Sequence, residues 1–76
     1  MTPQQYIAAR DALGWTHAEL ARVLGTSDRT LFRWQAGKTG ISKPEARLLR
    51  LLVRLRFTLP TRRFEEIIRE MSISND

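Results

Sequence analysis

The sequence predicts an all-α fold, a compact bundle of about five short helices. Apolar residues recur every three or four positions along five segments, and no segment alternates apolar and polar residues as a half-buried strand does. The length of 76 residues fits one small domain. Because a core of this size is marginal, association between copies would be a common way to stabilise it.

The predicted helices span residues 3–13, 17–24, 28–36, 42–56 and 60–71. A Ser or Thr precedes or begins each of the first four, and in three of these Glu or Gln follows three residues later, which is the pattern of a capping box. A Gly follows each of the first three helices, where a left-handed backbone can end a helix. The predicted helix caps therefore agree with the helices predicted from the apolar periodicity.

Composition narrows the classes of function. The net charge is +5, and the segment 44–63 carries six Arg against one Glu, whereas the residues from Phe64 onward are mainly acidic. A basic surface favours polyanions, so we expect a polyanion site within the first 63 residues. The chain has no Cys, one His, no paired-carboxylate motif and no Gly-rich phosphate loop, which argues against an enzyme, a metal site or a cofactor. With no long apolar run and no signal peptide, a cytoplasmic location is expected and a membrane partner is not.

Residues 16–38 have the outline of two helices joined by a turn at Gly25. Arg29 and Arg33 lie one helical turn apart on the side of the second helix opposite its apolar residues. This is the arrangement of a helix-turn-helix that places its second helix in the major groove of double-stranded DNA. Arg is suited to such a role because its guanidinium can form two hydrogen bonds with guanine O6 and N7.

Residues 7–55 resemble the helix-turn-helix of the phage Cro and repressor family, also called XRE-like. The residues that carry the resemblance are Arg10, Thr16-x-x-Glu19-Leu20-Ala21, Leu24-Gly25-Thr26-Ser27 and Thr30-Leu31-x-x-Trp34-x-x-Gly37-Lys38. The resemblance implies a lambda-repressor-like bundle whose third helix enters the major groove and whose members usually bind palindromic operators as dimers.

The resemblance also implies site residues. The positions that read bases are Asp28, Arg29, Thr30 and Arg33. The positions that hold phosphates are His17, Arg22, Thr26, Ser27, Lys38, Thr39 and Lys43. His17 stands where the family usually carries Gln, and it is either a phosphate ligand or an exposed, idle side chain. If it acts only when charged, DNA affinity should fall between about pH 6 and 8.

Three residues need a separate interpretation. Phe32 stands where the family often carries a polar residue, and it either packs beneath the fourth helix or contacts a thymine methyl group. Arg10 matches an inward Arg that usually pairs with an acid, but the matching position here holds Gln35. We therefore expect Arg10 to bond to this amide, to keep partial solvent contact, or to find another acceptor. Trp15 is expected to pack at the corner between the first two helices.

The predicted fourth helix has a basic face formed by Arg47, Arg50 and Arg54. This face is either solvated, in contact with flanking phosphates, or paired with acids of the tail. The predicted apolar face of the same helix comprises Leu48, Leu49, Leu51, Leu52, Val53 and Leu55.

The tail carries an apolar stripe of Phe64, Ile67, Ile68 and Met71. The stripe either completes the core of the monomer or meets a second copy across a two-fold axis. Family precedent favours a dimer, which divides the chain into a helix-turn-helix unit, 1–57, and a dimerisation helix, 58–76. Two copies would place their third helices about 34 Å apart. Residues 72–76 are expected to fray.

The leading functional hypothesis is a sequence-specific, homodimeric DNA-binding transcriptional regulator, most simply a repressor of a short phage or mobile-element operon. The alternative is an antitoxin-type protein that binds a protein partner, such as a toxin or antirepressor, and represses its own promoter. A bundle that binds only protein would require Arg29 and Arg33 to be dispensable for nucleic-acid binding.

Overall fold

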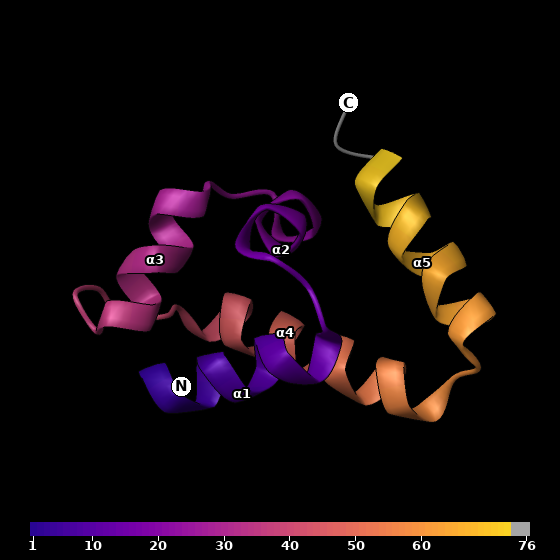
Figure 1. Ribbon diagram of the computed structural model, residues 1–76, viewed down its shortest axis with the longest axis horizontal. Coiled ribbons are helices and arrows are strands. Elements are labelled where there is room, and N and C mark those ends of the chain that lie inside the picture. Colours follow the sequence, from indigo (N-terminus) through magenta and orange to yellow (C-terminus); the bar gives the residue numbers. More distant parts are fainter. Residues whose placement is uncertain (74–76) are drawn as a thin grey trace.

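Five helices follow one another in the computed structural model, and Figure 1 shows their arrangement. They are α1 (Pro3–Leu13), α2 (His17–Leu24), α3 (Asp28–Ala36), α4 (Lys43–Thr58) and α5 (Thr61–Ile73). The structure describes residues 1–73, and it describes side chains up to residue 71. The described part contains no strand, so the predicted all-α bundle is confirmed. Of the residues expected to fray, the first two continue α5, and 74–76 lie outside the described residues.

The starts of the helices follow from local hydrogen bonds. Thr2 accepts from the amide of Gln5 at 3.1 Å and donates its own amide to the Gln5 side chain at 2.9 Å, which completes a capping box. Thr16 caps α2 in the same reciprocal way. The predicted third box is half formed, because the Glu45 carboxylate accepts from the Ser42 hydroxyl at 2.6 Å instead of from the Ser42 amide. Ser42 still accepts from the Glu45 amide and therefore still caps α4.

The turn between α2 and α3 depends on Gly25. Its φ of 73° lies in the left-handed region, which a residue with a Cβ adopts only at a cost. The amide of Thr26 then donates to the carbonyl of Ala21 at 3.0 Å and closes the last turn of α2. This turn sets the direction in which α3 leaves α2.

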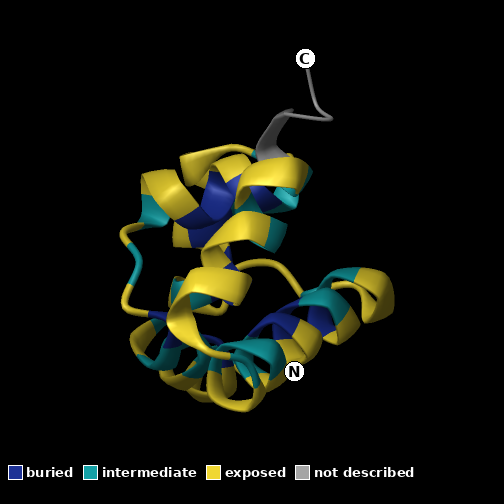
Figure 2. Cartoon of the chain, turned by 90° about the vertical axis from the view of Figure 1, so that its right-hand side faces the viewer, coloured by how far each residue is buried: buried dark blue, intermediate teal, exposed yellow. Residues whose placement is uncertain are grey.

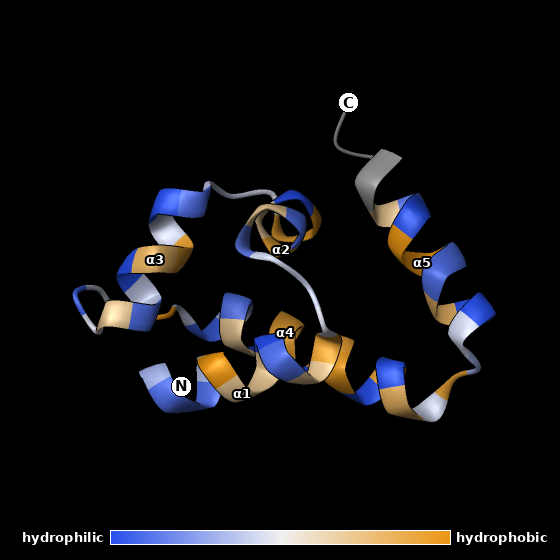
Figure 3. Cartoon of the chain, in the orientation of Figure 1, coloured by the Kyte–Doolittle hydropathy of each residue, from blue (hydrophilic) through white to orange (hydrophobic). Residues whose placement is uncertain are grey.

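The core draws side chains from all five helices. Tyr6, Leu20, Leu31, Leu49 and Leu52 are fully buried. Helix α1 packs against α3 and α4, and α2 packs against α3 and α5. Figure 2 shows the buried residues on the inner sides of the helices, and Figure 3 shows that each helix also carries hydrophilic residues. Amphipathic helices around one small core are thus the basis of the fold.

Helix α5 covers the corner between α1 and α2. Phe64 is only 3% exposed, and its ring stacks on that of Trp15 with the centroids 5.8 Å apart. On α4, the guanidinium carbon of Arg56 lies 6.0 Å from the centroid of the same ring. The prediction that Trp15 packs at this corner is confirmed, and the partner that covers it comes from the tail.

The tail stripe predicted as a dimer interface lies partly in the core of the monomer, and its contact with a second copy stays a prediction. Phe64 belongs to the buried core, and Ile68 and Met71 pack against it as partly buried side chains. The stripe therefore completes the core of the monomer, because α2 and α4 leave an apolar surface that α5 covers. Ile67 is half-buried and lies in a hollow on the other side of α5, between Leu59 and the charged residues of that helix.

The outer face of α4 is solvated in the monomer. Arg47, Arg50 and Arg54 are exposed, and among the described residues no ion pair joins them to α5. Instead Glu66 lies 3.9 Å from Arg62 of its own helix, an exposed pair that contributes little to stability. Leu51 is also exposed, so the apolar face predicted for this helix was too wide. None of the helices within residues 1–73 has the length and apolar character needed to cross a membrane.

Candidate nucleic-acid interface

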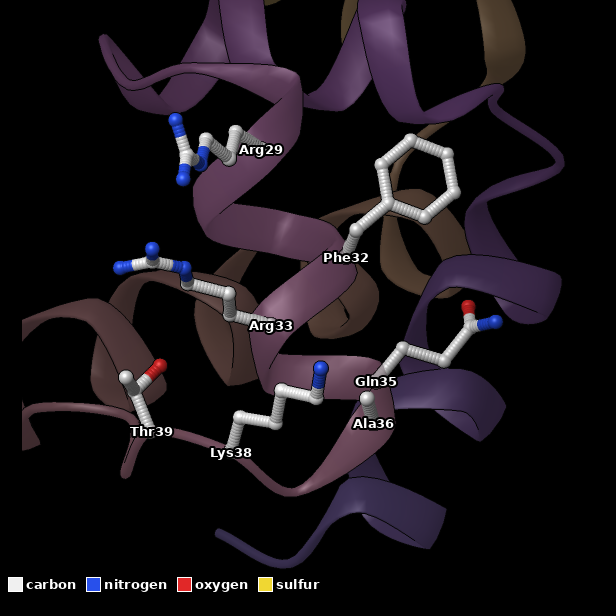
Figure 4. A pocket seen from close by; sticks show the side chains of 7 residues that line it. All are labelled: Arg29, Phe32, Arg33, Gln35, Ala36, Lys38 and Thr39. Carbon is white, nitrogen blue, oxygen red and sulfur yellow. The ribbon is translucent and has the colours of Figure 1, made fainter.

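The outer face of α3 carries the predicted base-reading Arg residues. Arg29 and Arg33 are exposed and extend from the same side of the helix (Figure 4). On the opposite side Leu31 and Trp34 are buried and fix α3 against the rest of the bundle. Neither Arg takes part in an ion pair within the described part of the chain. Both guanidinium groups are therefore held on a rigid helix with their donors directed outward.

The first turn of α3 is fixed by Ser27. Its hydroxyl accepts from the amide of Thr30 at 3.3 Å and lies 3.1 Å from the Thr30 hydroxyl. Asp28 is exposed in the same turn, where a negative charge suits the helix dipole. The two hydroxyls predicted to contact DNA are thus already bonded to each other, although each keeps further capacity to donate or accept.

An open hollow of about 710 Å³ lies along the outer face of α3. Its lining residues are Arg29, Phe32, Arg33, Gln35, Ala36, Lys38 and Thr39, and Figure 4 shows their side chains. The structure therefore brings Lys38 and Thr39, two of the predicted phosphate ligands, beside the Arg residues. Lys43 lies apart from them, in a second hollow between the N-terminus and α4. Arg22 is exposed on α2, and Thr26 is half-buried in the turn, and neither lines the first hollow.

His17 is placed differently from the sequence-based expectation. Its Nδ1 atom lies 3.0 Å from the hydroxyl of Tyr6, and its Nε2 atom lies 3.1 Å from Oε1 of Gln35. Its ring also meets that of Phe32, with the centroids 4.3 Å apart. The side chain is therefore not idle, because both ring nitrogens have partners inside the protein. Its contact with a phosphate stays a prediction.

The amide oxygen of Gln35 settles which way these hydrogen bonds run, because it can only accept, and Nε2 of His17 therefore donates to it. In the neutral ring Nδ1 is then an acceptor, and the Tyr6 hydroxyl donates to it. Burial raises the pKa of the Tyr6 phenol above its usual value, and the nearby charge of Arg10 opposes this shift in part. One chain of hydrogen bonds thus joins α1, the start of α2 and the end of α3.

Arg10 finds an acceptor other than the expected amide. Its Nη1 atom donates to the carbonyl oxygen of Trp15 at 3.2 Å, and the side chain is half-buried. Its Nε atom is buried and has no hydrogen-bond partner. The amide oxygen of Gln35, the expected acceptor, bonds to His17 instead. Tyr6 and Gln35 are the two residues of this network whose roles could not be found from sequence, since nothing local pairs residues 11 and 18 positions away from His17.

These features define a class of protein, a five-helix bundle that presents the second helix of a helix-turn-helix with exposed Arg residues on its outer face. The sequence model of the Helix-turn-helix family matches residues 7–54, which is more than half of the chain. The chain belongs to this family, in its XRE-like branch, and the resemblance to Cro and repressor proteins is confirmed. It is accordingly a DNA-binding transcription regulator of the XRE type. Comparisons with curated proteins and with solved structures gave no match.

Proposed function

We propose that the protein binds a specific operator in double-stranded DNA, reads it with α3, and represses a short operon. The observation that carries this proposal is the pair of exposed, unbridged guanidinium groups of Arg29 and Arg33 on a helix whose other side is buried. A guanidinium that meets guanine O6 and N7 contributes about 1–3 kcal/mol of discrimination. Asp28 and Thr30 lie at the start of the same face and would contact neighbouring base edges.

Phosphate contacts would supply the remaining affinity. Lys38 and Thr39 lie beside Arg33 along the hollow, at the position where the backbone of a duplex flanking the groove would pass. Lys43 and Arg22 are exposed farther away and would meet phosphates only on a longer stretch of the duplex. Such contacts give affinity without sequence information and make binding depend strongly on salt.

We further propose that two copies bind a palindromic operator. Phe64 is buried in the monomer, so the contact between copies would use the outer surface of α5 and the link before it, where Ile67 and Leu59 are half-buried beside charged residues. Sedimentation at micromolar concentration, with and without operator, tests this proposal. A monomer under both conditions would contradict it.

The alternative of an antitoxin-type protein depended on a tail stripe free to bind a protein partner. Phe64 is buried, and Ile68 and Met71 are partly buried against the core, so such a partner would meet the outer surface of α5 instead. The exposed Arg residues of α3 favour repression through operator binding, and co-purification with a neighbouring gene product would favour the alternative.

Selection of bound sequences from random duplex DNA tests the proposal with the full chain. We expect an enriched site that contains guanines in two halves related by a two-fold axis, with their centres about 10 base pairs apart. A pool that stays unenriched after selection, or equal affinity for the selected duplex and a scrambled competitor, would contradict sequence-specific binding.

A further inference from the structure

Phe32 is a large apolar side chain left in solvent on the outer face of α3. It is 54% exposed, and its ring extends away from the guanidinium groups of Arg29 and Arg33 in Figure 4 while lining the same open hollow. The sequence allowed two roles for this ring, packing beneath the fourth helix or contact with a methyl group. The aromatic ring that it meets is that of His17, on α2. The first role is therefore not what the structure shows.

The Phe32 ring has a fixed support. The imidazole beneath it, 4.3 Å between centroids, is bonded through one nitrogen to Tyr6 and through the other to Gln35. Tyr6 is fully buried and meets the ring of Trp34 edge-on at 5.9 Å. The support thus extends into the core, and the exposed side of Phe32 is held in one place without a partner. A preorganised apolar surface of this kind binds a small apolar group with little loss of conformational freedom.

The charges around the ring indicate what it meets. Arg29, Arg33 and Lys38 line the same hollow, so its electrostatic complement is a polyanion. In the major groove each base edge is a pattern of hydrogen-bond donors and acceptors, and the apolar group available there is the C5-methyl of thymine. A pyrimidine C5-methyl is therefore the group that matches both the apolar ring and its basic surroundings.

We propose that Phe32 is a base-reading residue that recognises the C5-methyl group of a pyrimidine next to the bases read by the two Arg residues. This inference rests on the proposed function, because it assumes that α3 lies in the major groove. His17 acts in it as a positioning residue that holds the ring. Shielding one methyl group from water is expected to change the dissociation constant about fourfold, and about sixteenfold when both halves of a palindromic site lose it.

The test uses the selected operator and DNA variants that differ from it by one methyl group on a base. Each thymine is replaced in turn by deoxyuridine, which removes only the methyl group, and the dissociation constant of the full-length protein is measured. We expect one position in each half-site to lose about fourfold. In a second arm each cytosine is replaced by 5-methylcytosine, and a gain of similar size at one position would identify a methylated cytosine as the source of the methyl group.

Two protein variants assign the effect to the ring. Phe32→Ala should bind the thymine and deoxyuridine operators equally, and Phe32→Leu should keep part of the preference. Phe57→Ala is the matched control, since Phe57 is 72% exposed on α4 and should leave the methyl preference unchanged. Neither Phe is in the core, so both variants should fold.

Different failures are distinguishable. If no duplex is enriched by selection, the proposed function itself is wrong. If a site is enriched but no methyl group affects binding in either arm, or if Phe32→Ala keeps the full methyl preference, the operator reading stands and the role of Phe32 is overturned.

Discussion

The hydrogen bonds of His17 predict an unequal response to two substitutions. His17→Ala removes the acceptor of a phenol that is fully buried, whereas Tyr6→Phe removes the phenol and leaves an imidazole that is only half-buried. A buried polar group without a partner is penalised more than a hydrogen bond lost as a pair. The substitution at His17 should therefore be the more destabilising one.

The number of hydrogen bonds that each substitution breaks sets the expected loss of stability. Tyr6→Phe should lower the free energy of unfolding by about 1 kcal/mol, the net value of one hydrogen bond. His17→Ala should lower it by about 2–4 kcal/mol, because it orphans the phenol and also removes the bond to Gln35. In the double variant no phenol remains to be orphaned, so its loss should be about 2 kcal/mol, well below the sum of the single losses. A domain of this length has only about 4–11 kcal/mol of stability in total.

Urea denaturation of the four proteins, followed by Trp fluorescence and by circular dichroism, measures this cycle. The loss of imidazole packing occurs in both backgrounds and cancels in the coupling energy. Equal losses for the two single variants, or losses that add within about 0.3–0.5 kcal/mol, would refute the reasoning.

Three further predictions concern titration, phosphate contacts and the tail. Because burial raises the pKa of Tyr6 in the folded state, its contribution to stability should be complete below about pH 10 and be lost as the pH rises through the raised value; Tyr6→Phe should lack this alkaline component in unfolding experiments. Lys38→Ala should flatten the slope of log affinity against log salt by about one unit, more than Lys43→Ala does. Equal slopes for the wild type and both variants would show that Lys38 does not contact a phosphate. Phe64→Ala should lower the free energy of unfolding by about 3–5 kcal/mol, while Phe57→Ala should change it by less than about 0.5 kcal/mol; similar losses would contradict the core position of Phe64.

The parts of the fold that are local could be predicted from sequence. Thr16 and Gly25 mark the two ends of α2 through hydrogen bonds and a backbone conformation that involve only neighbouring residues. The outward direction of Arg29 and Arg33 follows from the helical period once Leu31 and Trp34 are placed inward. For the same reason the start of α3 and the side of it that faces solvent were predicted together.

The parts that depend on distant residues could not be predicted. An apolar stripe such as that of α5 has the same pattern whether it covers its own core or that of a second copy, and only the packing of Phe64 on Trp15 distinguishes the two. The imidazole of His17 meets groups from α1 and α3 that no local spacing relates. The N-cap of α4 could be predicted only in part, because the sequence identifies Ser42 as the cap but not the rotamer of the Glu45 carboxylate.

The central claim is that the outer side of α3 reads base edges, and Arg33 offers its most direct measurement. Dissociation constants of the wild type, Arg33→Ala and the matched exposed variant Arg54→Ala should be measured on the selected operator and on all its single base-pair substitutions. We predict that Arg33→Ala loses about 1–3 kcal/mol of preference at one guanine and keeps its other preferences, while Arg54→Ala keeps them all. If Arg33→Ala weakens binding to every duplex by the same factor, the helix does not read the operator through this side chain and the claim is contradicted.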